Sequence, residues 1–146
     1  MSSGSGTDGR GVLDTSTVIL LPRFDDATAL PEEPAITAVT LAELSVGPLV
    51  AQDERQRAAR QVHLQQAEAD FDPLPFDAAA ARAFGGVAAS LRRAGRKTAA
   101  RTYDAMIAAT AIANQLPLYT CNPDDFAGID DLHVVALPAP PPLGTG

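Results

Sequence analysis

Short apolar segments alternate with longer helical patterns along most of this chain, and this alternation restricts the possible fold more than any other feature. Alternation of this kind predicts a parallel β-sheet with helices on both faces. The expected architecture is therefore α/β, with three layers and a central parallel sheet. The segments predicted to be strands are residues 12–13, 35–39, 116–120 and 133–137, and residues 74–76 are compatible with a further short strand.

Polar residues suited to helix capping mark where the predicted helices begin. Thr40 is expected to cap the helix after the second strand, and Thr40 with Glu43 would then form a capping box. The helix after Asp77 carries apolar residues at helical spacing, and Gly95 is expected to end it. The predicted helix starts are Thr15–Thr17, Thr40, Asp77, and either Thr98 or Thr102, and residues 53–71 have the composition of a long, mostly polar helix.

A chain of 146 residues with 46% hydrophobic residues is expected to form one domain with its own core. That domain is predicted to span residues 11–137. Residues 1–10 are predicted to be a flexible N-terminal extension, and residues 138–146 a tail rich in Pro and Gly. No apolar run approaches the ~20 residues that a membrane-spanning helix needs, and no signal peptide is recognisable, so a cytoplasmic location is expected.

Four carboxylates lie far apart in the chain but are expected to meet in the fold. Asp14, Glu43 and Asp125 each follow a predicted strand, and sites in such sheets form outside the carboxyl ends of the strands. Asp104 lies in a helix, on the face that also carries Ile107. Clustered carboxylates raise one another's pKa unless a cation neutralises them. Oxygen-only ligands suit Mg²⁺ or Mn²⁺, which commonly support phosphoryl transfer.

Each acidic residue also has a purely structural explanation. Asp14 could cap a helix, although Thr15 to Thr17 could do so equally well, and Glu43 could belong to the capping box. Asp124 and Asp125 could simply form a turn after Asn122. Asp104 is harder to explain in this way, because Asp is unfavourable inside a helix. Their combined order and placement favour a shared metal site.

Net charge is −7, which argues against a generally basic nucleic-acid-binding protein. Basic residues nevertheless cluster locally, where they could either bind backbone phosphate or form a solvated helix end. The single cysteine, Cys121, excludes an internal disulfide and is expected to be buried without a nucleophilic role, while His63 and His133 are expected at the surface. The candidate phosphate-binding residues are Arg92, Arg93, Arg96, Lys97 and Arg101.

The segments around these carboxylates resemble PIN-domain ribonucleases, and in particular toxins of the VapBC toxin–antitoxin class. The resemblance rests on residues 13–16, 40–44, 104–109 and 120–126, and it runs from about residue 11 to residue 137. It implies a metal-dependent endoribonuclease acting on single-stranded or structured RNA, usually dimeric and silenced by a cognate antitoxin protein. One departure is Cys121, at a position where a basic residue is common.

The resemblance also implies roles for individual residues. Asp14, Glu43 and Asp104 match the invariant acidic positions, and Asp125 matches a more variable fourth. Asp14, Asp104 and Asp125 would bind one Mg²⁺ or Mn²⁺ ion, while Glu43 would bind a second ion or orient the attacking water. Asn122 matches a position near the metal, and Asp124 is a further possible ligand.

Two other classes of phosphate-handling protein need a residue that this sequence lacks. A haloacid-dehalogenase-like phosphohydrolase needs a second Asp two residues after the first, where this chain has Ser16. A response-regulator-like switch needs a lysine near the last strand, and the only lysine is Lys97. A PIN-like processing or flap nuclease outside toxin biology remains an alternative, as does a hydrolase of small phosphate esters.

Overall fold

The computed structural model of this chain describes residues 9–140 and contains four parallel strands in the order β2-β1-β3-β4. Parallel pairing places Val12 beside Ala35 on one side and Leu118 on the other. The strands are β1 (Arg10–Leu13), β2 (Glu33–Ala35), β3 (Leu118–Thr120) and β4 (Val134–Ala136). The helices are α1 (Thr15–Leu20), α2 (Ala38–Val46), α3 (Glu54–Asp70), α4 (Ala78–Arg93) and α5 (Thr102–Ala113), with short 3-10 turns η1 (Leu21–Arg23), η2 (Ala27–Ala29), η3 (Gly47–Val50), η4 (Ala99–Arg101) and η5 (Pro123–Phe126).

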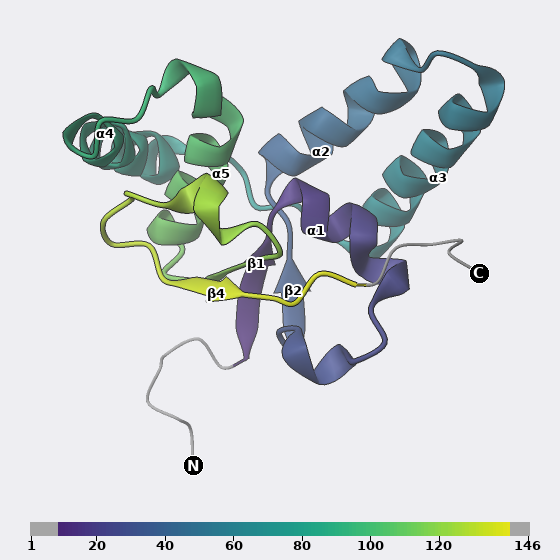
Figure 1. The fold of residues 1–146 in the computed structure, drawn as a ribbon, viewed down its shortest axis with the longest axis horizontal. Helices are drawn as coiled ribbons and strands as arrows, with labels where there is room; N and C mark the ends of the chain where they lie inside the picture. The colour runs from purple at the N-terminus through teal and green to yellow at the C-terminus, as the bar shows by residue number, and fades with distance from the viewer. Residues whose placement is uncertain (1–8, 141–146) are drawn as a thin grey trace.

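Helices cover both faces of the sheet, as the alternating pattern predicted (Figure 1). Successive residues of a strand point to opposite faces, so β1 contributes to two separate clusters of buried side chains. Val12 packs with Leu91 of α4 and Ile107 of α5, whereas Leu13 packs with Leu44 of α2 and residues of α1 and α3. The expected three-layer α/β fold is therefore confirmed.

The helix predicted for residues 53–71 is α3, and the predicted cap at Asp77 and stop at Gly95 of α4 are confirmed. Asp53 and Asp77 accept hydrogen bonds from backbone amides of the first turns of α3 and α4. Gly95 adopts a φ of +76°, a backbone conformation that side-chain-bearing residues rarely adopt, and the chain leaves the helix there. Residues 74–76 form only an isolated bridge, in which Leu74 pairs with Thr37.

The second strand and the start of α2 differ from the prediction. The strand ends at Ala35, and Thr37 rather than Thr40 caps α2 by accepting a hydrogen bond from the Thr40 amide at 3.1 Å. The backbone of Ile36 accepts from the Leu74 amide, which keeps this segment extended until Ala38. The expected capping box of Thr40 and Glu43 is therefore wrong, and Glu43 needs another explanation.

The first helix also has a different cap from the one expected. Asp14, and not Thr15, Ser16 or Thr17, is the N-cap of α1, because its carboxylate accepts from the Thr17 amide at 3.3 Å. β1 begins at Arg10, and the expected extension and tail otherwise lie largely outside the described residues 9–140. Within that range, every helix is too short or too polar to cross a lipid bilayer.

Candidate active site

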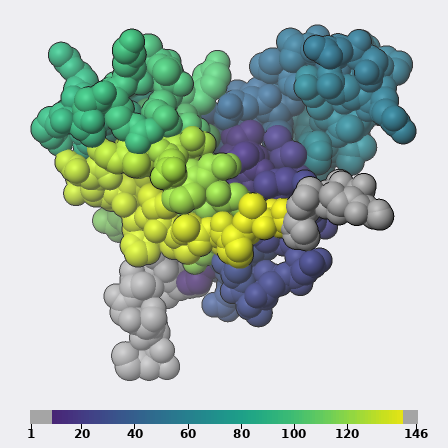
Figure 2. Space-filling view, viewed as in Figure 1, coloured from purple at the N-terminus to yellow at the C-terminus, as the bar shows by residue number. Residues whose placement is uncertain are grey.

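Two helical lobes flank a hollow in the surface above the carboxyl ends of the strands. Figure 2 shows this hollow between α4–α5 (green) and α2–α3 (blue), with α1 (purple) at its base. A cavity of about 550 Å³ there is lined by Glu43 and Asp104 together with the segment between them in space, residues 99–103. Asp14 follows β1 and the turn η5 follows β3, so the predicted acidic segments all lie around one region of the fold.

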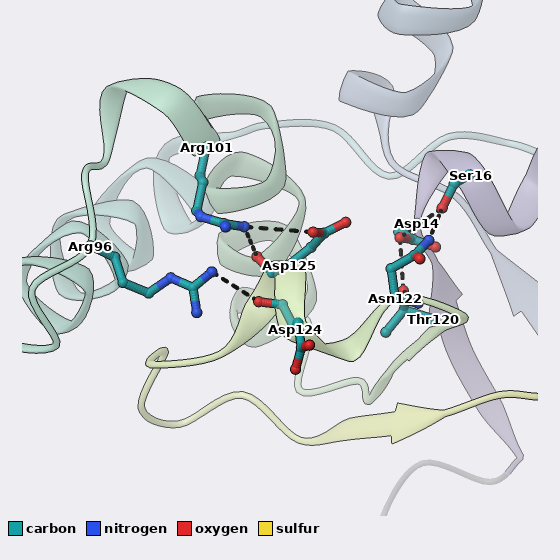
Figure 3. Close-up of polar contacts among 8 residues, drawn as sticks. All are labelled: Asp14, Ser16, Arg96, Arg101, Thr120, Asn122, Asp124 and Asp125. Carbon is teal, nitrogen blue, oxygen red and sulfur yellow. Dashed lines mark hydrogen bonds and ion pairs between the residues drawn. The ribbon is translucent and has the colours of Figure 1, made fainter.

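Asp14 is buried and is held by several hydrogen bonds (Figure 3). The hydroxyl of Thr120 donates to Asp14 Oδ2 at 2.9 Å, and the hydroxyl of Ser16 donates to the same oxygen at 3.3 Å. Asn122 supports both donors, because its backbone amide donates to the Thr120 hydroxyl and its side-chain amide donates to Ser16. A carboxylate has about four acceptor positions. With the Thr17 amide on Oδ1, three of them are used, and one remains.

Glu43 is held by a chain of threonine hydroxyls. Thr15 Oγ1 donates to Glu43 Oε1 at 2.6 Å and lies 2.9 Å from the hydroxyl of the fully buried Thr40. Because Thr15 uses its only hydroxyl proton on Glu43, Thr40 is the donor in the second contact. The structure thus assigns Thr40 to the orientation of Glu43 and not to the helix cap.

The pKa of Asp104 is affected by the other three carboxylates. Partial burial raises the pKa of Asp104 above its ordinary value of 3.8, the negative charges of Asp125, Glu43 and Asp14 add to the increase in that order, and Arg101 opposes it, so that together they bring the pKa to about 6. Its side chain is half-buried at the start of α5, and the predicted neighbour Ile107 is fully buried. Asp14, Glu43 and Asp125 thus all lie close enough to Asp104 to affect its charge.

Arginine side chains hold the turn η5, which carries the fourth carboxylate. Arg101 donates to the backbone oxygen of Asp125 at 3.1 Å and lies 3.7 Å from its carboxylate, and Arg96 donates to the backbone oxygen of Asp124 at 3.0 Å. Figure 3 shows the Asp125 carboxylate directed toward the side where Asp14 and Asn122 lie, whereas the Asp124 carboxylate points away. Asp124 is exposed and does not contribute to the pKa shift of Asp104.

The donor chemistry of the four carboxylates fits a hard divalent cation, since all donors are oxygen and their charges repel. The present side-chain positions are more open than a closed metal centre. Within residues 9–140, no three acidic, histidine or cysteine side chains are placed closely enough to hold an ion together. Arg101 supplies the positive charge nearest to Asp125 in this arrangement.

The predicted phosphate-binding residues divide into two groups. Arg93 forms an ion pair with Asp130 at 2.7 Å, and Arg96 and Arg101 bind η5, so these three also have structural roles. Arg92 and Lys97 are exposed and make no side-chain hydrogen bond or ion pair within the described part of the chain. Only Arg101 of the five lines the cavity beside Asp104.

The remaining candidates from the sequence are peripheral to this cavity. Cys121 is only half-buried, so the expectation that it is buried was wrong, and its burial raises the pKa of its thiol, which disfavours the nucleophilic thiolate. His133 is exposed and His63 is half-exposed at the surface of α3. Sequence reasoning missed the hydroxyls of Thr15 and Thr120. Their only signal was that each directly adjoins a predicted acidic segment.

The fold and the acidic cluster together define a class, and comparison with known proteins agrees with it. The family model described as "PIN domain" matches residues 12–132, and the chain belongs to this family. It is 41% identical over 135 residues to "Ribonuclease VapC5" of Mycobacterium tuberculosis (strain ATCC 25618 / H37Rv), covering 91% of this chain and 97% of that protein.

Two further comparisons extend this result. "Ribonuclease VapC4" of the same strain is 33% identical over 130 residues, which cover 88% of this chain and 97% of that protein. A crystal structure of VapBC-5 from Mycobacterium tuberculosis, described as a member of the VapBC family of toxin–antitoxin systems, superposes with a TM-score of 0.77 and 38% identity. That match covers 88% of this chain and 99% of the matched chain.

Proposed function

We propose that this protein is an endoribonuclease that hydrolyses phosphodiester bonds of single-stranded or structured RNA, and that it is the toxin of a type II toxin–antitoxin pair. The observation that carries this proposal is the placement of Asp14 after β1 and of Asp125 after β3 at the same end of the sheet, beside the cavity that Glu43 and Asp104 line. The similarity to two proteins named as VapC ribonucleases supports RNA as the substrate. Both relatives are matched over nearly their whole length.

Activity depends on Mg²⁺ or Mn²⁺ in this proposal. Asp14, Asp104 and Asp125 would hold the ion, with Asn122 as a neutral oxygen donor beside them, and Glu43 orients the attacking water or holds a second ion. Such an ion, when bound, lowers the pKa of water and offsets negative charge on the reacting phosphate. In-line attack by water then leaves a 5′-phosphate and a 3′-hydroxyl.

Hydrogen bonds within the site would orient the carboxylates for that chemistry before the substrate binds. Thr120 and Ser16 hold the Asp14 carboxylate in one orientation, and Thr15 does the same for Glu43. Donors of this kind limit the movement of the carboxylates before the substrate arrives. Arg101 lies beside the carboxylates, where its guanidinium can approach a phosphate of the RNA backbone.

The proposed partner is a cognate antitoxin that inserts a basic side chain into the acidic site. An arginine can pair with two oxygens of a carboxylate and thereby exclude both cation and substrate. The solved VapBC-5 structure, described as belonging to the toxin–antitoxin family, supports a partner of this kind. The chain is further proposed to act as a homodimer in the cytoplasm, where its RNA substrate is found.

Cleavage of single-stranded RNA by the purified, partner-free protein tests this function directly. We expect cleavage with Mg²⁺ or Mn²⁺, loss of cleavage with a chelator, and 5′-phosphate ends on the products. Co-expression with the protein encoded next to this gene should yield an inactive complex. Full activity in a variant that combines Asp14→Asn with Asp104→Asn would contradict the assignment of the site.

A further inference from the structure

Two adjoining hollows lie between α2 and the start of α5. The first is the cavity of about 550 Å³ that contains Asp104, and the second has a volume of about 250 Å³. Glu43 and Tyr103 line both hollows, so the two adjoin each other. Whatever occupies the second hollow therefore lies directly beside the acidic cluster.

The two hollows differ in chemistry. The first contains the charged groups of Arg101 and Asp104. The second is formed by Ala42, Val46 and the ring of Tyr103, with Glu43 at the boundary that the hollows share. A charged compartment thus meets a smaller compartment that is mainly apolar.

Tyr103 is the most unusual member of the second hollow. Its side chain is 59% exposed, although it adjoins Asp104 in the chain, and Val46 beside it is 52% exposed. Within residues 9–140 its hydroxyl makes no hydrogen bond, so the ring is not held by a polar partner. Its backbone belongs to the first turn of α5, directly before Asp104 in the chain.

We propose that the second hollow binds one unpaired nucleobase of the RNA, stacked on Tyr103, next to the phosphate that is cleaved. This inference rests on the proposed ribonuclease function and extends it to the recognition of the substrate. A nucleotide joins a charged phosphate to a flat, largely apolar base through one ribose, which matches a charged hollow joined to an apolar one. Aromatic side chains commonly stack on unpaired bases in this way.

The boundary between the hollows favours a base over an apolar side chain of a protein partner. Glu43 Oε1 accepts a hydrogen bond from Thr15, and the carboxylate keeps acceptor capacity at the edge of the apolar hollow. The exocyclic amino groups of bases are donors that can use this capacity, whereas an apolar side chain cannot. Stacking on Tyr103 also requires the target to be single-stranded, because a paired base does not expose its face.

Tyrosine fluorescence can test the proposal without relying on catalysis. The chain has no tryptophan and two tyrosines, Tyr103 and Tyr119. The ring of Tyr119 packs against Gly11 and lines neither hollow. The variant Tyr119→Phe therefore leaves Tyr103 as the only fluorophore, and Tyr103→Phe is the matched control with only Tyr119.

A single-stranded ten-nucleotide oligoadenylate, added with Ca²⁺ in place of Mg²⁺, serves as the probe. We expect it to quench the fluorescence of the Tyr119→Phe variant strongly and that of the Tyr103→Phe variant weakly. An abasic strand of the same length should quench neither. Equal quenching by the abasic strand, or quenching confined to Tyr119, would overturn the proposal.

Binding and kinetics provide a second measurement. Replacement of Tyr103 by Leu keeps an apolar side chain but removes the ring, and we expect it to weaken binding of the oligoadenylate about tenfold and to raise KM accordingly. Tyr103→Phe should bind within about twofold of the original protein, since its ring can still stack. An unchanged Kd and KM in Tyr103→Leu would contradict base stacking.

The outcomes separate this inference from the proposed function. Absence of RNA cleavage by the original protein would refute the ribonuclease itself. Normal cleavage with unchanged RNA binding in Tyr103→Leu would refute only the base-binding role. If Tyr103→Leu loses inhibition by the partner protein while RNA binding stays the same, the hollow is a docking site for the partner, and the proposal is wrong.

Discussion

The two sides of the acidic site are built in different ways. On one side, Asp14 is buried and accepts hydrogen bonds from the neutral groups of Thr17, Thr120 and Ser16. On the other side, Asp125 lies in a short 3-10 turn, is only half-buried, and is paired with Arg101. Neutral donors orient a carboxylate and leave its charge in place, whereas an arginine offsets that charge.

This difference has a functional consequence. The Asp14 side is already organised, because hydrogen bonds from buried groups hold it in one position. In the proposed metal site, a cation bound by Asp125 would compete with Arg101 for its carboxylate. We therefore expect Asp14 to contribute more to metal affinity than Asp125 does.

The largest expected effect is the difference in RNA cleavage between Asp14→Asn and Asp125→Asn. Loss of the Asp14 charge should reduce RNA cleavage about 100-fold or more, whereas loss of the Asp125 charge should reduce it about tenfold. Initial rates and calorimetric titration with Mn²⁺ would measure both. Asp124→Asn is the matched control, because its carboxylate points away from the site, and it should change little (Figure 3). Equal losses at Asp14 and Asp125 would remove the distinction between the two sides.

The next effect concerns the donor that orients Asp14. Thr120→Val removes the hydroxyl and keeps the shape, so we expect Mn²⁺ affinity to fall about 10-fold or more. Thr120→Ser restores the hydroxyl and should recover most of the affinity. Thr110→Val is the control, since Thr110 is equally buried but donates to the backbone oxygen of Met106 within α5. A similar loss of affinity in the control would mean that packing, and not orientation, is responsible.

A smaller effect of opposite sign is expected at Arg101. Arg101→Gln removes the positive charge that would compete with a cation for Asp125, so Mn²⁺ affinity should rise. Because a partly exposed ion pair contributes up to about 1 kcal/mol, the increase should be about fivefold at most. RNA affinity should fall at the same time, because a phosphate-binding candidate is lost. Arg93→Gln breaks an ion pair with Asp130, which is not one of the four site carboxylates, and serves as the control for Mn²⁺ affinity. Weaker Mn²⁺ binding in Arg101→Gln would show that Arg101 supports the metal site.

The smallest expected effect is on stability without metal. The pKa of Asp104 is raised to about 6 in the folded protein and is near 3.8 when unperturbed, so folding is accompanied by proton uptake between these values. The stabilising effect is complete below about pH 4 and is lost as pH rises through about 6. Asp104→Asn should therefore stabilise the metal-free protein at pH 7.5 by about 1 kcal/mol or less, after allowance for solvent screening, and by less at pH 4.5.

Urea unfolding in the presence of a chelator at the two pH values would measure this difference. Added Mn²⁺ should reverse the order at pH 7.5, because a bound cation stabilises the folded original protein more than the variant. If Asp104→Asn is equally stabilising at both pH values, repulsion between ionised carboxylates is not the cause.

Local signals in the sequence were sufficient for much of the fold. Asp53 and Asp77 each cap the helix that follows, and Gly95 ends α4, since these residues act through backbone groups within a few positions. The alternation of apolar segments was also sufficient to predict parallel strands with helices on both faces. The same local reasoning failed at Thr40, where a contact with Leu74, far along the chain, keeps Thr37 extended and moves the cap.

The sequence by itself determined which residue types could form an acidic site and which strand ends could bring them together. Only the tertiary structure decided how each carboxylate is held, because the decisive contacts join distant residues. Thr120 meets Asp14 across 106 positions, Thr15 meets Glu43 across 28, and Arg101 meets Asp125 across 24. Pairings at such separations depend on the packing of strands and helices, and no local pattern of residues specifies them.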